Sequence, residues 1–424
     1  MKKNTSTKDL GLSSNERLFL KNKSIFMPKK YINLKPYGLK IYTFNAGFKK
    51  KFEDLLILIF DQPVNSKIVY SKTSTPSAPI IWDKKHNNGS VKALIVNSGN
   101  ANAHTGDKGL KNIDKYVSNL SKLLNCKKNE ILVSSTGVIG QELNPNLIIN
   151  QISRITKKQS GDLLDAAKSI MTTDTFPKIL VKNVKINKKK FKIYGIAKGS
   201  GMIYPNMATT LGYIFTDATL SSSVLNEVLK NNIKTTFNAI SCDGDTSTND
   251  MVSIFSTSKV NHSEIKKYSD SKLKNFNKAV HDVLLNLAKQ VVSDGEGASK
   301  FISINCINCR TEKDAKNISF KIANSLLVKT AIAGEDPNWG RVAMAIGNSD
   351  SKINEQKLSI SFGPYKIYHK GSLYKSYDEE KVMEYMKGKS IEIEVDIGQG
   401  VKKFKSYTMD LTKKYIEINA DYRT

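Results

Sequence analysis

The stretch Lys198-Gly-Ser-Gly-Met-Ile-Tyr-Pro-Asn-Met-Ala-Thr-Thr-Leu-Gly-Tyr-Ile-Phe-Thr-Asp217 is a glycine-rich turn followed at once by an apolar run. The turn delivers the hydroxyl of Thr209 to the start of a predicted strand. No histidine lies between His104 and His262, so no neighbouring imidazole in the sequence can deprotonate that hydroxyl. A threonine that becomes the first residue of a new chain can use its own α-amine as the base. Cleavage after Ala208 is therefore one hypothesis, and an ordinary turn leading into a strand is the other.

The rest of the chain alternates between short β-branched runs and helical patterns. We predict buried strands at residues 55–60, 91–96 and 131–135, each bounded by small or polar residues. Amphipathic patterns predict helices at residues 110–124 and 271–292. The alternation is typical of a mixed α/β protein.

Length and composition predict three parts. The chain has 424 residues, which is more than a typical single domain. Residues 1–36 are polar and rich in Lys and Asn, and we expect a flexible arm rather than a secretory signal. We expect a main domain over residues 37–300 and a smaller C-terminal α/β domain over residues 301–424. In the smaller domain we predict a strand at 301–308 and a helix at 314–331.

The net charge of +27 would ordinarily suggest nucleic acid as a partner. Of the 66 basic residues, however, only five are arginine, the residue preferred for bidentate phosphate and base contacts. We therefore predict no nucleic-acid partner. The longest compact apolar run, residues 55–60, is far shorter than a membrane span, so we also expect no membrane partner and a cytoplasmic location.

The sequence offers two weak metal-binding patterns. Cys306 and Cys309 have metal-like spacing, but no second Cys or His pair lies near them, and they fall in a predicted strand. Residues 243–250 resemble part of a calcium loop without its distal Glu. We predict reduced structural cysteines, no metal and no cofactor.

Several turn-rich clusters hold residues suited to acyl chemistry. Thr136 and Gly137 follow a predicted strand, where hydroxyl and backbone N–H donors can stabilise an oxyanion. Lys198 could hold a carboxylate, and Glu296, between two glycines, could bind an ammonium group. Each residue also has a purely structural explanation, namely a turn glycine, a solvated surface lysine and a helix C-terminal turn.

Seven motifs in order resemble the ornithine acetyltransferase (glutamate N-acetyltransferase) family of arginine biosynthesis. The resemblance covers about residues 37–424. The motifs lie at residues 97–103, 135–140, 171–175, 198–209, 294–297, 336–341 and 419–424. It implies an α/β fold of the α+β type, with a β core of stacked sheets flanked by helices and a self-generated N-terminal threonine nucleophile.

The resemblance further implies that the precursor cuts itself between Ala208 and Thr209. The products are an α chain (1–208) and a β chain (209–424), which assemble as an α2β2 heterotetramer. Thr209 would take the acetyl group from N-acetylornithine and pass it to glutamate, while Thr136 and Gly137 stabilise the oxyanion. Substrate-binding positions implied by the family are Thr175, Lys198, Thr209, Glu296, Asn419 and Thr424. Whether acetyl-CoA also donates acetyl groups stays open.

Two departures and two alternatives accompany this resemblance. Thr210 stands where the family often has Met, which leaves two adjacent hydroxyls, and His104 stands where Cys is frequent. A related self-processing aminopeptidase or amidohydrolase, usually with a serine nucleophile, is the first alternative. A basic binding protein without catalysis is the second.

Overall fold

The structure is a computed structural model of the whole chain. It describes residues 24–32, 34–186, 189–204, 210–263 and 265–420. Three predicted site residues, Ala208, Thr209 and Thr424, lie outside the described residues, as does most of the predicted arm.

An eight-stranded sheet forms the larger part of the molecule. Its order is β4-β3-β2-β8-β7-β6-β5, and β1 pairs with β2. The strands are β1 (Leu39–Phe44), β2 (Leu55–Tyr70), β3 (Ser90–Asn100), β4 (Ile131–Val138), β5 (Lys178–Ile186), β6 (Lys189–Lys198), β7 (Leu211–Ala218) and β8 (Met251–Val260).

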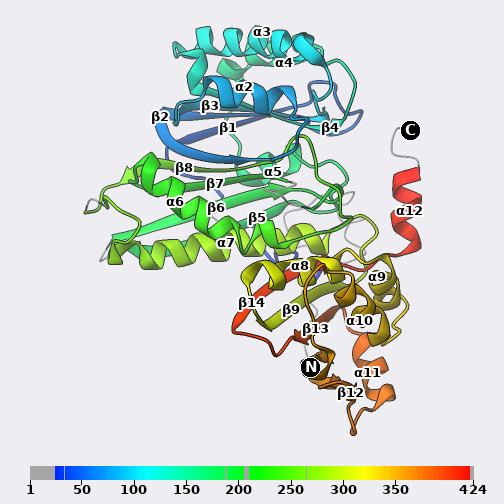
Figure 1. Cartoon of the computed structure of the whole chain (residues 1–424). Helices are drawn as coiled ribbons and strands as arrows, with labels where there is room; N and C mark the ends of the chain where they lie inside the picture. Colours follow the sequence, from blue (N-terminus) through cyan, green and yellow to red (C-terminus); the bar gives the residue numbers. More distant parts are fainter. Residues whose placement is uncertain (1–23, 33, 187–188, 205–209, 264, 421–424) are drawn as a thin grey trace, which may run out of the picture.

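The long strand β2 folds this sheet into two layers. Its first half pairs with β1 and with most of β3, and its second half pairs with β8 from Asn65 to Tyr70. The register with β3 shifts between Ile59 and Val64. As a result, β1 to β4 stack over β5 to β8 (Figure 1).

Side-chain alternation along the strands builds three apolar layers. The middle layer joins the two halves of the sheet, for example Leu58 of β2 with Tyr213 and Phe215 of β7. The other face of β2, including Ile57, packs in a second core with Trp82 and its neighbours. These continuous apolar strands are buried on both faces, which is why their sequences are so strongly hydrophobic.

Helices cover both outer faces, so the predicted β core of stacked sheets flanked by helices is confirmed (Figure 1). Above β1 to β4 lie α2, α3 and α4, and below β5 to β8 lie α6 and α7. The short helix α5 packs against β1, β5 and β6. The bounds are α2 (Ala78–His86), α3 (Gly106–Leu124), α4 (Pro145–Ile152), α5 (Leu163–Ser169), α6 (Ser222–Ile233) and α7 (Lys274–Ser293).

A second, six-stranded sheet has the order β12-β11-β10-β13-β9-β14. Its strands are β9 (Phe301–Cys309), β10 (Ser359–Phe362), β11 (Tyr365–His369), β12 (Ser372–Leu373), β13 (Ser390–Asp396) and β14 (Lys402–Met409). The helices here are α8 (Glu312–Ala323), α9 (Leu326–Ala333), α10 (Trp339–Gly347), α11 (Glu379–Met386) and α12 (Lys413–Ala420). The domain boundary near residue 300 stays a prediction.

The single helix predicted at residues 314–331 is wrong. The segment forms two helices, α8 and α9, because Ser325 starts a new helix by accepting a hydrogen bond from Val328 N. Ser and Asn side chains compete for backbone groups and so favour helix ends over helix interiors. In the part of the chain that the structure describes, every helix is too short or too polar to cross a membrane.

Candidate active site

A cavity of about 310 Å³ opens where several strands of the larger sheet end. Its walls come from the end of β4, the end of β6, the start of β7 and the segment just before β8, with further residues from the loop after α7 and from α12. Five predicted site residues, far apart in sequence, line it together: Thr136, Gly137, Lys198, Glu296 and Asn419.

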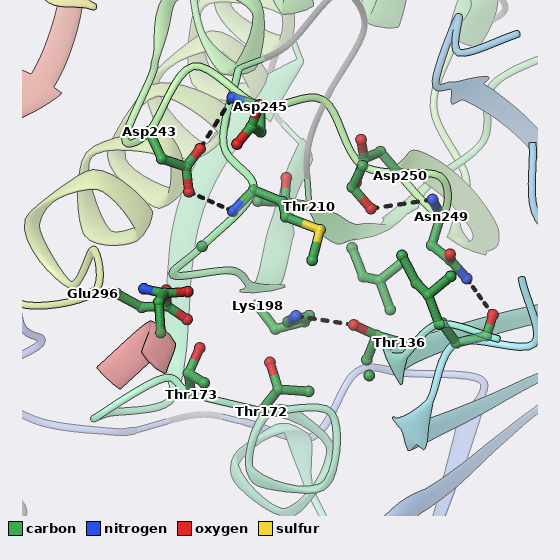
Figure 2. A pocket seen from close by; sticks show the side chains of 18 of the residues that line it. Thr136, Thr172, Thr173, Lys198, Thr210, Asp243, Asp245, Asn249, Asp250 and Glu296 are labelled. Carbon is green, nitrogen blue, oxygen red and sulfur yellow. Dashed lines mark hydrogen bonds between the residues drawn. The ribbon is translucent and has the colours of Figure 1, made fainter. Parts of the chain in front are cut away.

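Lys198 and Thr136 face each other across this cavity (Figure 2). The Nζ of Lys198 donates a hydrogen bond to Thr136 Oγ1 at 3.0 Å. Because Thr136 accepts this bond, its own hydroxyl proton remains available to donate elsewhere. An ammonium group and a hydroxyl so arranged can stabilise an oxyanion.

Burial lowers the pKa of Lys198 below its ordinary value. Asp174, Asp250 and Glu296 oppose this effect by favouring the charged form, whereas the nearby ammonium of Lys178 adds to it. Lys198 is therefore a buried, chemically perturbed group at the cavity and not a solvated surface lysine.

Gly137 allows two strands to approach closely at the cavity. It has φ +130°, and a Cβ at this position would lie 2.3 Å from the carbonyl carbon of Gly99, its partner in β3. No other residue fits there without moving the backbone.

Glu296 and Asn419 form the opposite wall. Asn419 Nδ2 donates hydrogen bonds to Glu296 Oε2 at 2.9 Å and to Tyr415 O at 3.0 Å. Thr412 Oγ1 bonds Gly297 O just before α12, which brings this helix against the loop after α7. The carboxylate of Glu296 is well placed to bind a cationic group.

Gly201 makes room for that carboxylate. A Cβ on Gly201 would lie 2.6 Å from Glu296 Oε2. Because residue 201 is a glycine, the glycine-rich turn can lie close to the side chain of Glu296.

A buried ion cluster lies beside the cavity. Lys178 Nζ is 2.6 Å from both Asp174 Oδ1 and Asp294 Oδ2. Burial by itself would lower the pKa of Lys178, but the two carboxylates overcome that effect and raise it. Burial by itself would raise the pKa of Asp174, but Lys178 and Lys198 outweigh it, and the pKa lies below its ordinary value.

The cluster holds the glycine-rich turn in place. Asp174 Oδ1 accepts from Gly199 N at 2.8 Å, and Ser200 Oγ donates to Asp294 O at 2.6 Å. Glu296 N in turn donates to Ser200 O. The turn that carries Lys198 is thus tied to the loop that carries Glu296.

Thr175 is held by the same cluster. Its N–H donates to Asp294 Oδ2 at 2.9 Å and its hydroxyl to Asp294 Oδ1. Its neighbours Thr172 and Thr173, and not Thr175 itself, are among the described residues that line the cavity. Its role as a substrate contact stays a prediction.

Asp243, the first residue of the segment that resembles a calcium loop, has a structural role. The carboxylate of Asp243 accepts the backbone N–H groups of Met202 and Ile203 at 2.6 and 2.8 Å. Across the residues with described positions, no three His, Cys, Asp or Glu side chains gather as metal ligands.

Asn249, Thr210 and Asp250 were noted in the sequence, the first and last as part of a calcium-like loop, but were not predicted as site residues. Asn249 Nδ2 donates to Ala101 O at 2.6 Å and to Ser135 O at 2.9 Å, joining the loop that follows β3 to strand β4. Thr210 and Asp250 also line the cavity. In the sequence, the signal that could have pointed to Asn249 and Asp250 as site residues was the turn-rich cluster to which they belong.

Comparison with known proteins gives a match over nearly the whole chain. The ArgJ family model matches residues 40–424. The chain is 44% identical over 393 residues to an arginine biosynthesis bifunctional protein ArgJ from Bradyrhizobium diazoefficiens, covering 91% of this chain and 95% of the relative. The protein of that name from Caulobacter vibrioides is 39% identical over 393 residues, which cover 91% of this chain and 98% of the relative.

Two solved structures are also similar. A crystal structure of arginine biosynthesis bifunctional protein argJ from Bacillus halodurans has 35% identity and a TM-score of 0.48, covering 49% of this chain and 97% of that one. A structure of ornithine acetyltransferase with ornithine from Mycobacterium tuberculosis has 27% identity and a TM-score of 0.35, covering 41% and 94%. With the family match over residues 40–424 and relatives of about 40% identity along nine-tenths of its length, the chain belongs to the ArgJ family.

Proposed function

We propose that this protein is a glutamate N-acetyltransferase of arginine biosynthesis, which moves an acetyl group from N-acetylornithine to glutamate through an acetyl-Thr209 intermediate. The observation that carries the proposal is the cavity that gathers Thr136, Lys198 and Glu296 beside the start of β7. Its relatives are named arginine biosynthesis bifunctional proteins, which supports the same assignment.

The proposed reaction begins with self-cleavage between Ala208 and Thr209. The freed α-amine of Thr209 then acts as base for its own hydroxyl, which attacks the acetyl carbonyl of N-acetylornithine. The hydroxyl of Thr136, held by Lys198, and the backbone at Gly137 stabilise the oxyanion. The leaving amine of ornithine takes the proton from the α-amine of Thr209, and glutamate accepts the acetyl group in the second half.

The charges of the cavity suit both amino acids. Ornithine carries a cationic side chain, which the Glu296 carboxylate can bind, and Asn419 holds that carboxylate in place. Substrate carboxylates need donors, and the cavity supplies Lys198 together with the hydroxyls of Thr172 and Thr173. Thr175 and Thr424 are also proposed to contact the substrates.

Three further points belong to the proposal. Acetyl-CoA is proposed as a second acetyl donor for glutamate, in line with the bifunctional names of the relatives. The α chain (1–208) and the β chain (209–424) are proposed to assemble as α2β2. No metal or resident cofactor is needed for this chemistry.

A donor and acceptor assay tests the proposal. Purified protein is incubated with N-acetylornithine, with and without glutamate, and ornithine, N-acetylglutamate and acetate are measured. We expect N-acetylglutamate in equal amount to ornithine when glutamate is present. Release of acetate at a rate indifferent to glutamate would instead identify a hydrolase, the aminopeptidase-like alternative. Acetyl-CoA with glutamate, without N-acetylornithine, tests the second donor.

A further inference from the structure

The proposed cleavage leaves one proton transfer unassigned. After cleavage the α-amine of Thr209 can act as a base, but before cleavage that nitrogen is part of an amide and is not basic. Another group must take the proton from the Thr209 hydroxyl and then return a proton to the departing nitrogen. The following inference rests on the proposed self-cleavage.

Most ionisable groups of the cavity already have hydrogen-bond partners. Lys198 donates to Thr136, and one oxygen of Glu296 accepts from Asn419. Both oxygens of Asp243 accept backbone N–H groups. Such bonds hold these groups in fixed positions.

Asp250 differs from them. It is only 3% exposed, it lines the cavity, and its Oδ2 has no hydrogen-bond partner among the residues that the structure describes. A buried carboxylate oxygen without a hydrogen-bond partner destabilises the folded protein, so its presence calls for an explanation such as a catalytic role.

Asp250 lies next to Thr210, the first described residue after the proposed cleavage point. Met251 N, the next residue, donates to Thr210 O at 3.1 Å, and β7 and β8 run parallel from Leu211 and Met251. Thr210 lines the same cavity and is equally buried, and within the described part of the chain its hydroxyl also lacks a hydrogen-bond partner. Both groups thus line the same cavity next to the start of β7, which directly follows Thr209 in the sequence.

Burial raises the pKa of Asp250 well above its ordinary value. A hydrogen bond from Ser247 and the charge of Lys198 lower it, without cancelling the effect of burial. A carboxylate whose pKa is raised is a stronger base than an exposed one, and its acid form still gives the proton up readily.

We propose that Asp250 is the proton carrier of the self-cleavage step. The Asp250 carboxylate takes the hydroxyl proton of Thr209 as Oγ forms a bond to the carbonyl carbon of Ala208. When the carbon–nitrogen bond breaks, the Asp250 carboxylic acid gives that proton to the nitrogen of Thr209. Water then hydrolyses the resulting ester, which frees the carboxylate of Ala208 and the hydroxyl and amine of Thr209.

This assignment separates processing from transfer. Once cleavage is complete, the α-amine of Thr209 takes over as base, and Asp250 is no longer required for proton transfer. Loss of the Asp250 carboxyl should therefore slow the appearance of two chains far more than it lowers the transfer rate of chains already cut.

The matched control is Asp83. It is buried to a similar degree, and its Oδ2 has no partner in the described parts of the chain. Burial raises its pKa well above the ordinary value, but it lies on α2, outside the cavity. Asp250→Asn and Asp83→Asn make the same chemical change at two buried carboxyls. Only the first should affect cleavage.

The test is a time course of cell-free synthesis of the full chain, followed on denaturing gels. Wild type and Asp83→Asn should give two half-size chains at the same rate, and Asp250→Asn should be slower by about 100-fold or more. Circular dichroism checks that the uncut variant is folded. Transfer per cut chain should fall by a much smaller factor than the cleavage rate, because the remaining effect of Asp250 on transfer is its charge, which favours the charged form of Lys198.

A pH profile keeps the inference testable if Asp250→Asn does not fold. In the wild type, cleavage should slow as pH falls and Asp250 takes up a proton. Ser247→Ala removes a bond that stabilises the carboxylate, so this fall should move to higher pH.

Equal cleavage of Asp250→Asn and wild type, or an unmoved profile in Ser247→Ala, would overturn the role of Asp250 and leave the proposed function standing. A wild-type chain that stays uncut would instead overturn the proposed self-cleavage.

Discussion

Lys178 Nζ lies 2.6 Å from Asp294 Oδ2, and this buried ion pair joins the two sides of the proposed cleavage point. Lys178 begins β5 in the proposed α chain, and Asp294 ends α7 in the proposed β chain. Their side chains are 0% and 4% exposed. The pair gives a physical reason for the two chains to stay together after cleavage, since separating them would leave buried charges without partners.

Lys178→Met should destabilise the protein by about 3–5 kcal/mol, because it leaves Asp174 and Asp294 close together and uncompensated. Urea unfolding of the cleaved protein measures this change. In the double variant Lys178→Met, Asp294→Asn, only one of the two carboxylates is left uncompensated. Part of the lost free energy of unfolding should therefore be recovered.

Lys300→Met is the control for Lys178→Met. Lys300 is also buried, but its partner Glu335 is 44% exposed and water can solvate the carboxylate that is left. A smaller loss of stability is therefore expected. Equal losses in the two variants would argue against a special role for the buried cluster.

Gly201→Ala should raise the KM for N-acetylornithine at least tenfold. The added Cβ would lie 2.6 Å from Glu296 Oε2 and displace the carboxylate proposed to bind the cationic side chain. Steady-state kinetics measure the effect. Gly347→Ala is the control, since a Cβ there meets nothing within 4 Å, and an unchanged KM in Gly201→Ala would remove Glu296 from the substrate site.

Lys198→Met should lower kcat by about 10²–10³, the usual loss for one oxyanion-stabilising group. The group works as an ammonium ion, and burial lowers its pKa, so wild-type activity should fall at a pH below the ordinary lysine value as the proton is lost. The residual activity of Lys198→Met should lack this alkaline fall.

Lys49 provides the control for that pH profile. Burial lowers the pKa of Lys49 to about 8, and its Nζ donates to Met171 O at 3.0 Å rather than to the cavity. Lys49→Met should therefore keep the alkaline fall. If the alkaline fall in activity disappeared in Lys49→Met, the titrating group would be Lys49.

The sequence predicted those parts of the fold that depend on local pattern. The apolar runs at residues 55–60 and 91–96 predicted the cores of β2 and β3, because strands buried on both faces are continuously hydrophobic. The second half of β2 was missed because Asp61, Gln62 and Pro63 are exposed and are typical of a turn. Pairing with β8 overrides that local preference.

The candidate site was predictable only as separate motifs. Thr136, Lys198 and Glu296 were singled out from glycine-rich turns, and the family resemblance set their roles. Asp250 was noted only as part of a calcium-like loop and not as a residue of this site, because its position beside Thr210 depends on parallel pairing of β7 and β8 across the intervening helix α6. Such long-range pairing leaves no short pattern in the sequence.

The two adjacent hydroxyls at the start of β7 should behave differently. Thr209→Ala should abolish both cleavage and acetyl transfer, since it removes the proposed nucleophile. Thr210→Val should be cut normally and be as stable as wild type or more stable by about 1 kcal/mol, because the buried Thr210 hydroxyl has no hydrogen-bond partner to lose among the described residues.

Denaturing gels, the transfer assay and urea unfolding measure these effects together. If Thr209→Ala were cut normally and Thr210→Val stayed intact, the nucleophile would be Thr210. The unpaired Thr210 hydroxyl would then be explained as a reacting group in the same cavity as Asp250. The pair of variants therefore decides which of the two hydroxyls acts, whereas either variant alone could fail for structural reasons.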